Sequence, residues 1–110
     1  MKLVYFAFPY TEDPINCCKE IQTKVQHILD VSEDIVPLVP HFMFDALYDF
    51  PHGNTHVEFL EYEVELISRC DIFCYDPERV SVGVAWELAI AKKFGVKVMS
   101  YIDLTREVSE

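Results

Sequence analysis

The chain has 110 residues, of which 51% are hydrophobic and 14% aromatic. This length and composition predict a single globular domain over residues 1–110 and exclude an intrinsically disordered chain. The formal net charge of −10, from 19 acidic and 9 basic residues, argues against a nucleic-acid backbone or an anionic membrane as a partner.

The first third of the chain predicts a strand, a helix and a second strand. Residues 2–8 form a continuous apolar run that suits a central strand buried on both faces, and Pro9 ends it. Asp13 is a favourable helix N-cap, and the apolar stripe that follows it predicts a helix over Pro14–Val31. The proline-marked segment 35–40 predicts a strand nearer an edge of the sheet.

The middle of the chain combines an irregular segment with a capped helix. Residues 41–54 are rich in aromatic side chains. A loop of this length in a small domain is usually functional; the alternative is a cap over a corner of the core. Thr55 and Glu58 form a capping box, T-x-x-E, which predicts a helix as far as about Arg69. Residues 71–75 predict a third strand.

The last third of the chain predicts one more helix and one more strand. A mostly apolar helix over 81–94 begins at Ser81, a favourable N-cap, and stops before Gly95. Because this helix is apolar nearly all round, we expect it to be buried. Residues 96–101 predict the last strand, and the residues after it are expected to form a polar tail.

The order of these elements predicts the fold. Strands that alternate with helices indicate a parallel sheet with helices on both faces. We therefore expect an α/β protein, a small Rossmann- or flavodoxin-like three-layer sandwich with a mainly parallel sheet of four to five strands. Ligands of such sheets bind at the carboxyl ends of the strands, and this topology brings Ser81 and Gly83 to that edge.

Glu87 is the one charged residue in the apolar stretch 82–91. Charged side chains are seldom placed in apolar surroundings unless they are paired or used. Gly83 lies four residues earlier and has no side chain. Because helical side chains lean toward the N-terminus, we expect an opening for a small molecule above the carboxylate. The alternative is a buried glutamate held by a neighbouring hydroxyl or lysine.

Glu63 is the second acidic residue predicted to point inward. At 100° per residue, the other three glutamates of its helix fall on the solvent side, and Glu63 falls within the apolar arc. The alternative is a boundary glutamate whose carboxyl group reaches water. Two semi-buried acids in one pocket would give a nucleophile and a proton donor, and carboxylates about 5 Å apart suit a retaining glycosidic mechanism.

Tyr5 and Ser81 are the remaining candidates that follow from the residues themselves. Tyr5 lies on the first strand, where its phenol could hydrogen-bond Glu87 and orient it; the alternative is an ordinary core tyrosine. The Ser81 hydroxyl and the N–H groups after it could hold an anion or a sugar hydroxyl. The alternative is that Ser81 serves only as a helix cap.

Cysteine and histidine spacings do not indicate a metal site. Cys17 and Cys18 are adjacent, and neither they nor Cys70 and Cys74 form a C-x-x-C pair. We interpret them as buried free thiols of a reducing compartment and predict a cytoplasmic protein. No segment approaches the ~20 apolar residues of a membrane helix. The N-terminal apolar run is short and interrupted by Pro9, unlike a signal peptide.

Three segments carry a family resemblance. They are Val4-Tyr5-Phe6-Ala7, Arg69-Cys-Asp71-Ile-Phe and, most specific, Ser81-Val-Gly83-Val-Ala-Trp-Glu87-Leu-Ala-Ile-Ala91. In these segments the chain resembles the nucleoside 2-deoxyribosyltransferase-like superfamily, which includes the deoxyribonucleoside 5'-monophosphate N-glycosidases. The resemblance covers most of the chain.

The resemblance implies roles for three residues. In that family the glutamate at the position of Glu87 is the nucleophile, and the first-strand tyrosine, here Tyr5, positions it. An acid eight residues before the third-strand aspartate handles the proton of the leaving base. Counting back from Asp71 gives Glu63, the residue that periodicity also selects. The family usually has aspartate there, so the proton donor of this chain is one methylene longer.

The resemblance also implies substrate contacts. Where the transferases carry an aspartate for the sugar 5'-hydroxyl, this chain has Ser81, as the monophosphate hydrolases do, and a serine at a helix start suits a phosphate. Together with the N–H of Gly83 it would seat the 5' end of the substrate. Phe8 and Pro9, which stand where the family commonly has glycine, complete the predicted substrate-binding set.

The expected function is cleavage or transfer at the N-glycosidic bond of a (deoxy)nucleoside or its 5'-monophosphate. Aromatic side chains from 41–54 would stack on the base. No metal or organic cofactor is required. Related enzymes complete their sites across a subunit contact, so a homodimer or larger homo-oligomer is expected. The alternatives are a non-catalytic nucleotide-binding module of the same fold and an acidic protein-interaction domain.

Overall fold

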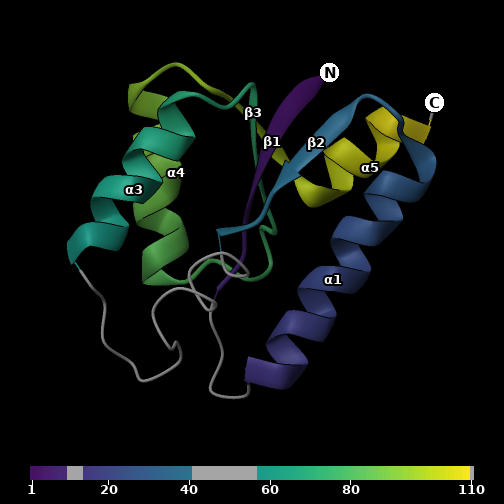
Figure 1. The fold of residues 1–110 in the computed structure, drawn as a ribbon, viewed down its shortest axis with the longest axis horizontal. Coiled ribbons are helices and arrows are strands. Elements are labelled where there is room, and N and C mark those ends of the chain that lie inside the picture. The colour runs from purple at the N-terminus through teal and green to yellow at the C-terminus, as the bar shows by residue number, and fades with distance from the viewer. Residues whose placement is uncertain (10–13, 41–56, 110) are drawn as a thin grey trace.

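One parallel sheet forms the centre of the molecule (Figure 1). The computed structural model describes residues 1–9, 14–40 and 57–109. Within them the strands run in the order β2-β1-β3-β4, and every neighbouring pair is parallel. The strands are β1 (Lys2–Ala7), β2 (Ile35–Leu38), β3 (Ile72–Tyr75) and β4 (Lys97–Ser100). The predicted α/β fold is therefore confirmed, and the proline-marked strand lies at an edge, as expected.

Helices cover both faces of the sheet (Figure 1). They are α1 (Pro14–Val31), α3 (Val57–Ser68), α4 (Val82–Lys93) and α5 (Tyr101–Ser109). One face carries α1 and α5, which pack on each other, and the other carries α3 and α4. The molecule thus has the three layers that the alternation of elements predicted.

β1 lies between β2 and β3 and is buried on both faces, which explains its continuous apolar sequence. Alternate side chains point to opposite layers: Val4 and Phe6 join the core under α1 and α5, whereas Tyr5 and Ala7 join the core under α3 and α4. This alternation places Tyr5 on the same side of the sheet as α4.

The two ends of α4 are set by local sequence signals. The side-chain oxygen of Ser81 accepts a hydrogen bond from the backbone N–H of Val84 at 3.1 Å, so Ser81 is the predicted N-cap. At the other end Gly95 has φ +71°, a conformation that favours glycine, and the N–H of Val96 bonds to the carbonyl of Ala91. The predicted helix boundaries are confirmed.

Two expectations about the C-terminal half were wrong. The residues after β4 form the helix α5 and not a polar tail: Ser100 caps it by accepting from the N–H of Asp103 at 3.1 Å, and Leu104 is buried against the sheet. Helix α4 is not buried all round, because Val82 is 90% exposed and only one side of the helix packs against the sheet and α3.

Some expectations lie outside the described residues: the N-cap Asp13, the aromatic segment 41–54 and the cap at Thr55. The four cysteines are free thiols, and three of them are buried. Among the helices that the structure describes, none combines the length and the apolar character needed to cross a bilayer.

Candidate functional site

The candidate site lies where the direction of strand addition reverses. β1 is followed in the chain by β2 on one side and pairs with β3 on the other. In open parallel sheets a crevice forms at such a point, beyond the carboxyl ends of the strands. Here the chain leaves β3 through a short loop and enters α4 at Ser81, so α4 points its N-terminus at that edge.

Glu87 and Tyr5 meet in the layer between the sheet and α4. Glu87 is 8% exposed and Tyr5 is fully buried, and the Tyr5 hydroxyl donates a hydrogen bond to Glu87 Oε2. The phenol ring is held by stacking on Phe73 of β3, with ring centroids 5.5 Å apart. The hydrogen bond that the sequence predicted between Tyr5 and Glu87, which are 82 positions apart, is therefore present.

Glu63 faces the same carboxyl group from α3. This half-buried side chain belongs to the helix that packs on α4. Burial raises the pKa of Glu63 to about 7. Burial and, to a lesser extent, the charge of Glu63 raise the pKa of Glu87 to about 8, against the opposing effect of the hydrogen bond from Tyr5. The Glu63 carboxyl group is therefore close enough to influence the ionisation of Glu87.

Ser81 and Gly83 occupy the start of α4, one turn before Glu87. Ser81 is half-buried and Gly83 is exposed. A side-chain carbon added at Gly83 would meet Ser81 Oγ at 3.7 Å, an ordinary contact, and no other described side chain lies within 4 Å of that position. No acidic residue lies in this first turn, which leaves the positive end of the helix dipole uncompensated by side chains of the turn.

Phe8 faces away from the two acids, and the described contact of Pro9 is with α1. Phe8 is buried in the core under α1 and α5, where it packs beside Phe6 with ring centroids 6.4 Å apart. The Pro9 carbonyl accepts a hydrogen bond from the Cys17 thiol of α1 at 3.5 Å. Both residues stand at the carboxyl end of β1, but the described contacts of Phe8 are on the opposite side of the sheet from Glu87.

An ion-pair network at the same edge was missed by sequence reasoning. Lys24 Nζ of α1 lies 2.8 Å from Oδ2 of Asp76, which follows β3. The same nitrogen lies 3.4 Å from Glu20 Oε1, and Glu20 also pairs with Arg79. Burial opposes the charge of Asp76, but hydrogen bonds from Lys24 and from the N–H of Glu78 outweigh it and lower the pKa of this carboxyl group. The available signal was an acid directly after a buried strand.

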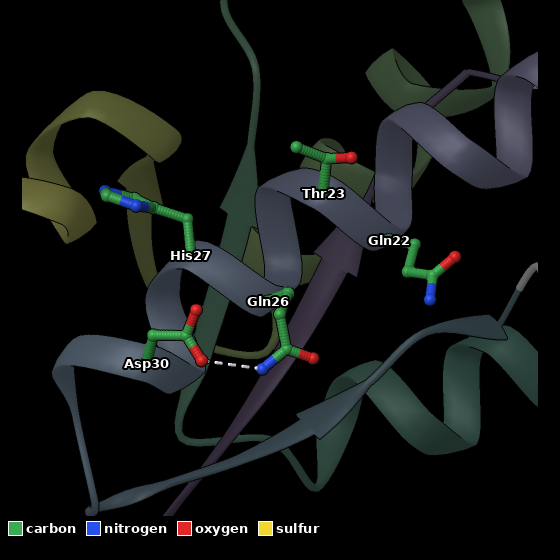
Figure 2. A pocket seen from close by; sticks show the side chains of 5 residues that line it. All are labelled: Gln22, Thr23, Gln26, His27 and Asp30. Carbon is green, nitrogen blue, oxygen red and sulfur yellow. Dashed lines mark hydrogen bonds between the residues drawn. The ribbon is translucent and has the colours of Figure 1, made fainter.

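The outer surface of α1 has an open depression that does not belong to this site. Figure 2 shows its lining side chains, which all come from one helix, and Gln26 donates to Asp30 at 2.8 Å. They are Gln22, Thr23, Gln26, His27 and Asp30. All five are exposed and none comes from a second element, so the depression lacks the convergent polar groups of a binding site.

The geometry supports proton transfer and nucleophilic attack at one place. A buried carboxylate held by a phenol is a candidate nucleophile, and a second carboxyl group whose pKa is near neutrality is a candidate acid and base. In the described part of the chain, no three His, Cys, Asp or Glu side chains are grouped in a way that could hold a metal ion.

The comparisons with known proteins concern the fold and the family. The chain is similar to a conserved protein from Enterococcus faecalis V583, whose crystal structure matches with a TM-score of 0.70 and 19% identity. The match covers 91% of this chain and 62% of that one, and at this identity it shows the fold alone. The comparison with curated proteins gives no match. Residues 2–101 match the family model described as a domain of unknown function, DUF7768, and the chain belongs to that family.

Proposed function

We propose that the protein cleaves or transfers the N-glycosidic bond of a (deoxy)nucleoside or its 5'-monophosphate. The observation that carries the proposal is the buried Glu87 carboxyl group. It accepts a hydrogen bond from Tyr5, and the charge of Glu63 raises its pKa. The Tyr5 hydroxyl alone would also suit a structural glutamate, but in the described structure the charged neighbour of Glu87 is a second acid. Active sites concentrate such perturbed acids.

The chemistry follows from the two carboxyl groups. An oxygen of Glu87 attacks the anomeric carbon while the bond to the base breaks, and the base leaves with the proton of Glu63. The product is a glycosyl ester on Glu87. Glu63, now ionised, removes a proton from water or from a second base, which attacks the anomeric carbon and frees Glu87. Both steps balance without a metal or an organic cofactor.

The mechanism needs Glu87 ionised and Glu63 protonated, whereas in the structure the pKa of Glu87, about 8, lies above that of Glu63, about 7. The proposal therefore requires that substrate binding reverse the order of the two pKa values. The hydrogen bond from Tyr5 lowers the pKa of Glu87 and so acts in the required direction. Ser81 and the N–H of Gly83 would seat the 5' end of the sugar.

Release of free base from a panel of nucleosides, deoxynucleosides and their monophosphates tests the proposal. Glu87→Ala should abolish release, and a mass-spectrometric trap should find a sugar on wild-type protein but not on this variant. Glu65→Ala, at an exposed acid of α3, is the matched control and should retain full activity. Base release that persists in Glu87→Ala would remove the proposed nucleophile.

A second candidate is a non-catalytic nucleotide-binding module. The absence of acidic residues in the first turn of α4 favours it as much as it favours an enzyme. This candidate predicts that a nucleotide raises the melting temperature equally in the wild type and in Glu87→Gln, with no base released.

A homo-oligomer and a cytoplasmic location remain part of the proposal. Light scattering tests the oligomeric state, and cell fractionation tests the location.

A further inference from the structure

The loop 76–81 joins β3 to α4, the helix whose start forms part of the candidate site. Two of its charged residues reach across to α1. Asp76 pairs with Lys24, and Arg79 pairs with Glu20. Helix α1 covers the face of the sheet that is opposite to α4 (Figure 1). The loop that leads into the candidate site is therefore tied to the layer on the other side of the sheet.

Asp76 holds the first half of this loop. Its buried carboxylate accepts two hydrogen bonds, one from Lys24 Nζ to Oδ2 at 2.8 Å and one from the N–H of Glu78 to Oδ1 at 3.0 Å. The carbonyl of Asp76 also accepts from the N–H of Arg79 at 3.0 Å, which closes a turn. Because hydrogen bonds to an ionised group are strong, these contacts favour a single shape for this half of the loop.

Lys24 is itself held in place by several elements. Its Nζ lies 5.6 Å from the ring centroid of Phe8, which directly follows β1, and 5.6 Å from that of Tyr101, at the start of α5. Both distances are within the range of a cation–π contact. The Tyr101 hydroxyl also donates to the backbone carbonyl of Lys24 at 3.4 Å. The cation that binds Asp76 is therefore fixed relative to the sheet.

Arg79 holds the second half of the loop. Its guanidinium group pairs with Glu20, and Glu20 Oε1 also lies 3.4 Å from Lys24 Nζ, one turn along α1. Only Val80 separates Arg79 from Ser81, and two consecutive Cα steps span at most about 7.6 Å. The position of Arg79 therefore limits where Ser81, the N-cap of α4, can lie.

The rest of the loop gains little from burial. Pro77 and Glu78 are exposed, and Val80 is 46% exposed. A segment with few buried apolar contacts opens locally at a low cost in free energy unless polar contacts hold it. The two ion pairs to α1 are therefore the main contacts that fix this loop in the described structure.

We infer that Lys24 and Arg79 are positioning residues of the candidate site. Through Asp76 and Glu20 they fix the loop, and with it Ser81 and the first turn of α4, where the substrate would be seated. The inference rests on the proposed function and goes beyond it, because the described ion pairs of these four residues are with one another and not with the two acids of the site.

Base release by matched variants tests the inference. Arg79→Met and Glu20→Gln should each raise KM about tenfold and leave kcat within about twofold of the wild type, because a seat for the unreactive end of the substrate binds substrate and transition state alike. Arg79→Lys can keep the ion pair and should restore most of the loss. Arg69→Met, which removes an arginine from its exposed pair with Glu65, should leave both constants unchanged.

The pattern of effects on KM separates positioning from direct contact with the substrate. Because Arg79 and Glu20 act as one unit, the double variant Glu20→Gln/Arg79→Met should raise KM no more than either single variant. If Arg79 bound the substrate itself, Glu20→Gln would free it and lower KM, and that result would overturn the inference. An unchanged KM in Arg79→Met, or a fall in kcat at an unchanged KM, would overturn it too.

Hydrogen exchange reports on the start of α4 without any turnover. The N–H groups of Val84 and Ala85 donate to the side-chain oxygen and to the carbonyl of Ser81, at 3.1 and 2.9 Å. In Arg79→Met these two amides should exchange at least about tenfold faster than in the wild type, whereas the amides of β1 should keep their rates. Equal rates at Val84 and Ala85 in both proteins would contradict the inference. Absence of base release from every ligand in the wild type would remove the proposed function alone, because the exchange measurement does not depend on catalysis.

Discussion

At the scale of single residues, the defining feature is a carboxyl group that is almost entirely buried. Glu87 is 8% exposed, and burial and the charge of Glu63 raise its pKa to about 8. A buried acid that is paired with another acid destabilises the fold when it ionises. This loss of stability is consistent with the proposal that Glu87 is retained for catalysis, because activity and stability often conflict at a catalytic site.

Glu87→Gln should therefore stabilise the protein at alkaline pH. Because the pKa of Glu87 is about 8 in the fold against 4.5 ordinarily, the folded state holds a proton that the unfolded state has lost, and wild-type stability falls as the pH rises from about 4.5 to about 8. Neutral glutamine removes this loss. We expect a gain of roughly 1–3 kcal/mol in the free energy of unfolding at pH 8.5 and little change at pH 5, measured by urea unfolding.

The control for this variant is Glu65→Gln, which removes an exposed carboxylate of α3 that lies 3.0 Å from Arg69. Exposed ion pairs contribute little, so the unfolding free energy should change by less than about 0.5 kcal/mol at either pH. Wild-type stability that is the same at pH 5 and pH 8.5 would show that Glu87 does not titrate as described.

Tyr5→Phe should shift the pH dependence of base release. The Tyr5 hydrogen bond lowers the pKa of Glu87, so its loss raises that pKa and leaves less of the nucleophile ionised at neutral pH. We expect the acidic limb of the profile of kcat/KM against pH to move to higher pH and activity at pH 7 to fall about 10- to 100-fold. A uniform loss of activity at all pH values would indicate that Tyr5 has a purely structural role. The control is Tyr75→Phe, at a half-buried tyrosine of β3, which should leave the pH profile unchanged.

At the scale of elements, α4 and α5 show how composition misleads about burial. Helix α4 is apolar around its circumference, yet Val84, Glu87 and Ala91 are the residues it buries. Helix α5 is polar in composition, yet one stripe packs on the sheet through Leu104. What decides burial is the direction of each side chain relative to the sheet, and not the mean character of the helix.

Leu104→Ala tests whether α5 is part of the core. Leu104 is 1% exposed, so its truncation removes buried apolar surface and leaves a cavity. We expect a loss of about 2–4 kcal/mol in the free energy of unfolding, measured with urea. Ile102→Ala, on the same helix but 47% exposed, should cost less than about 1 kcal/mol. Equal effects of the two variants would mean that α5 is not docked as described.

At the scale of the whole molecule, the two faces of the sheet bury different kinds of charged group. On the side of α1, acids and bases neutralise each other across elements: Lys24 joins α1 to Asp76 after β3. On the side of α4, the charge of Glu63 raises the pKa of Glu87. The ion pair links α1 to the carboxyl edge of the sheet, and the acid pair marks the layer of the candidate site.

A double-mutant cycle on Lys24 and Asp76 measures how strongly the layers are joined. Lys24→Met leaves the Asp76 carboxylate buried and unpaired, so it should destabilise the protein by about 2–4 kcal/mol, and Asp76→Asn should relieve part of that loss. Because the pKa of Asp76 is lowered, this stabilisation is present above pH 3.8 and lost as the pH falls below it.

The comparison pair for this cycle is Lys97 with Glu107, which are 3.8 Å apart and half exposed. Its coupling energy should be below about 0.5 kcal/mol, as for other exposed pairs. A coupling for Lys24 and Asp76 that is no larger than this value would show that the network does not hold α1 to the edge of the sheet.

Much of the fold was predictable because its signals are local. Pro14 and Ser81 mark helix starts, Gly95 marks a helix end, and the unbroken apolar sequence of β1 predicts a central strand. Helix α5 was missed although Ser100 and Asp103 have the spacing of a cap and its apolar residues follow a helical stripe, because the polar composition of the segment was interpreted as a tail.

The sequence by itself determined the alternation of elements, the helix caps and which acids turn inward, since these depend on residues a few positions apart. Only the tertiary structure decided that Phe8 turns to the opposite layer and that Lys24 is held by Asp76, and it chose the hydrogen bond to Glu87 from the two open interpretations of Tyr5. These depend on strand order and on the side of the sheet to which each residue points. Long-range pairing sets both, and no local pattern encodes it.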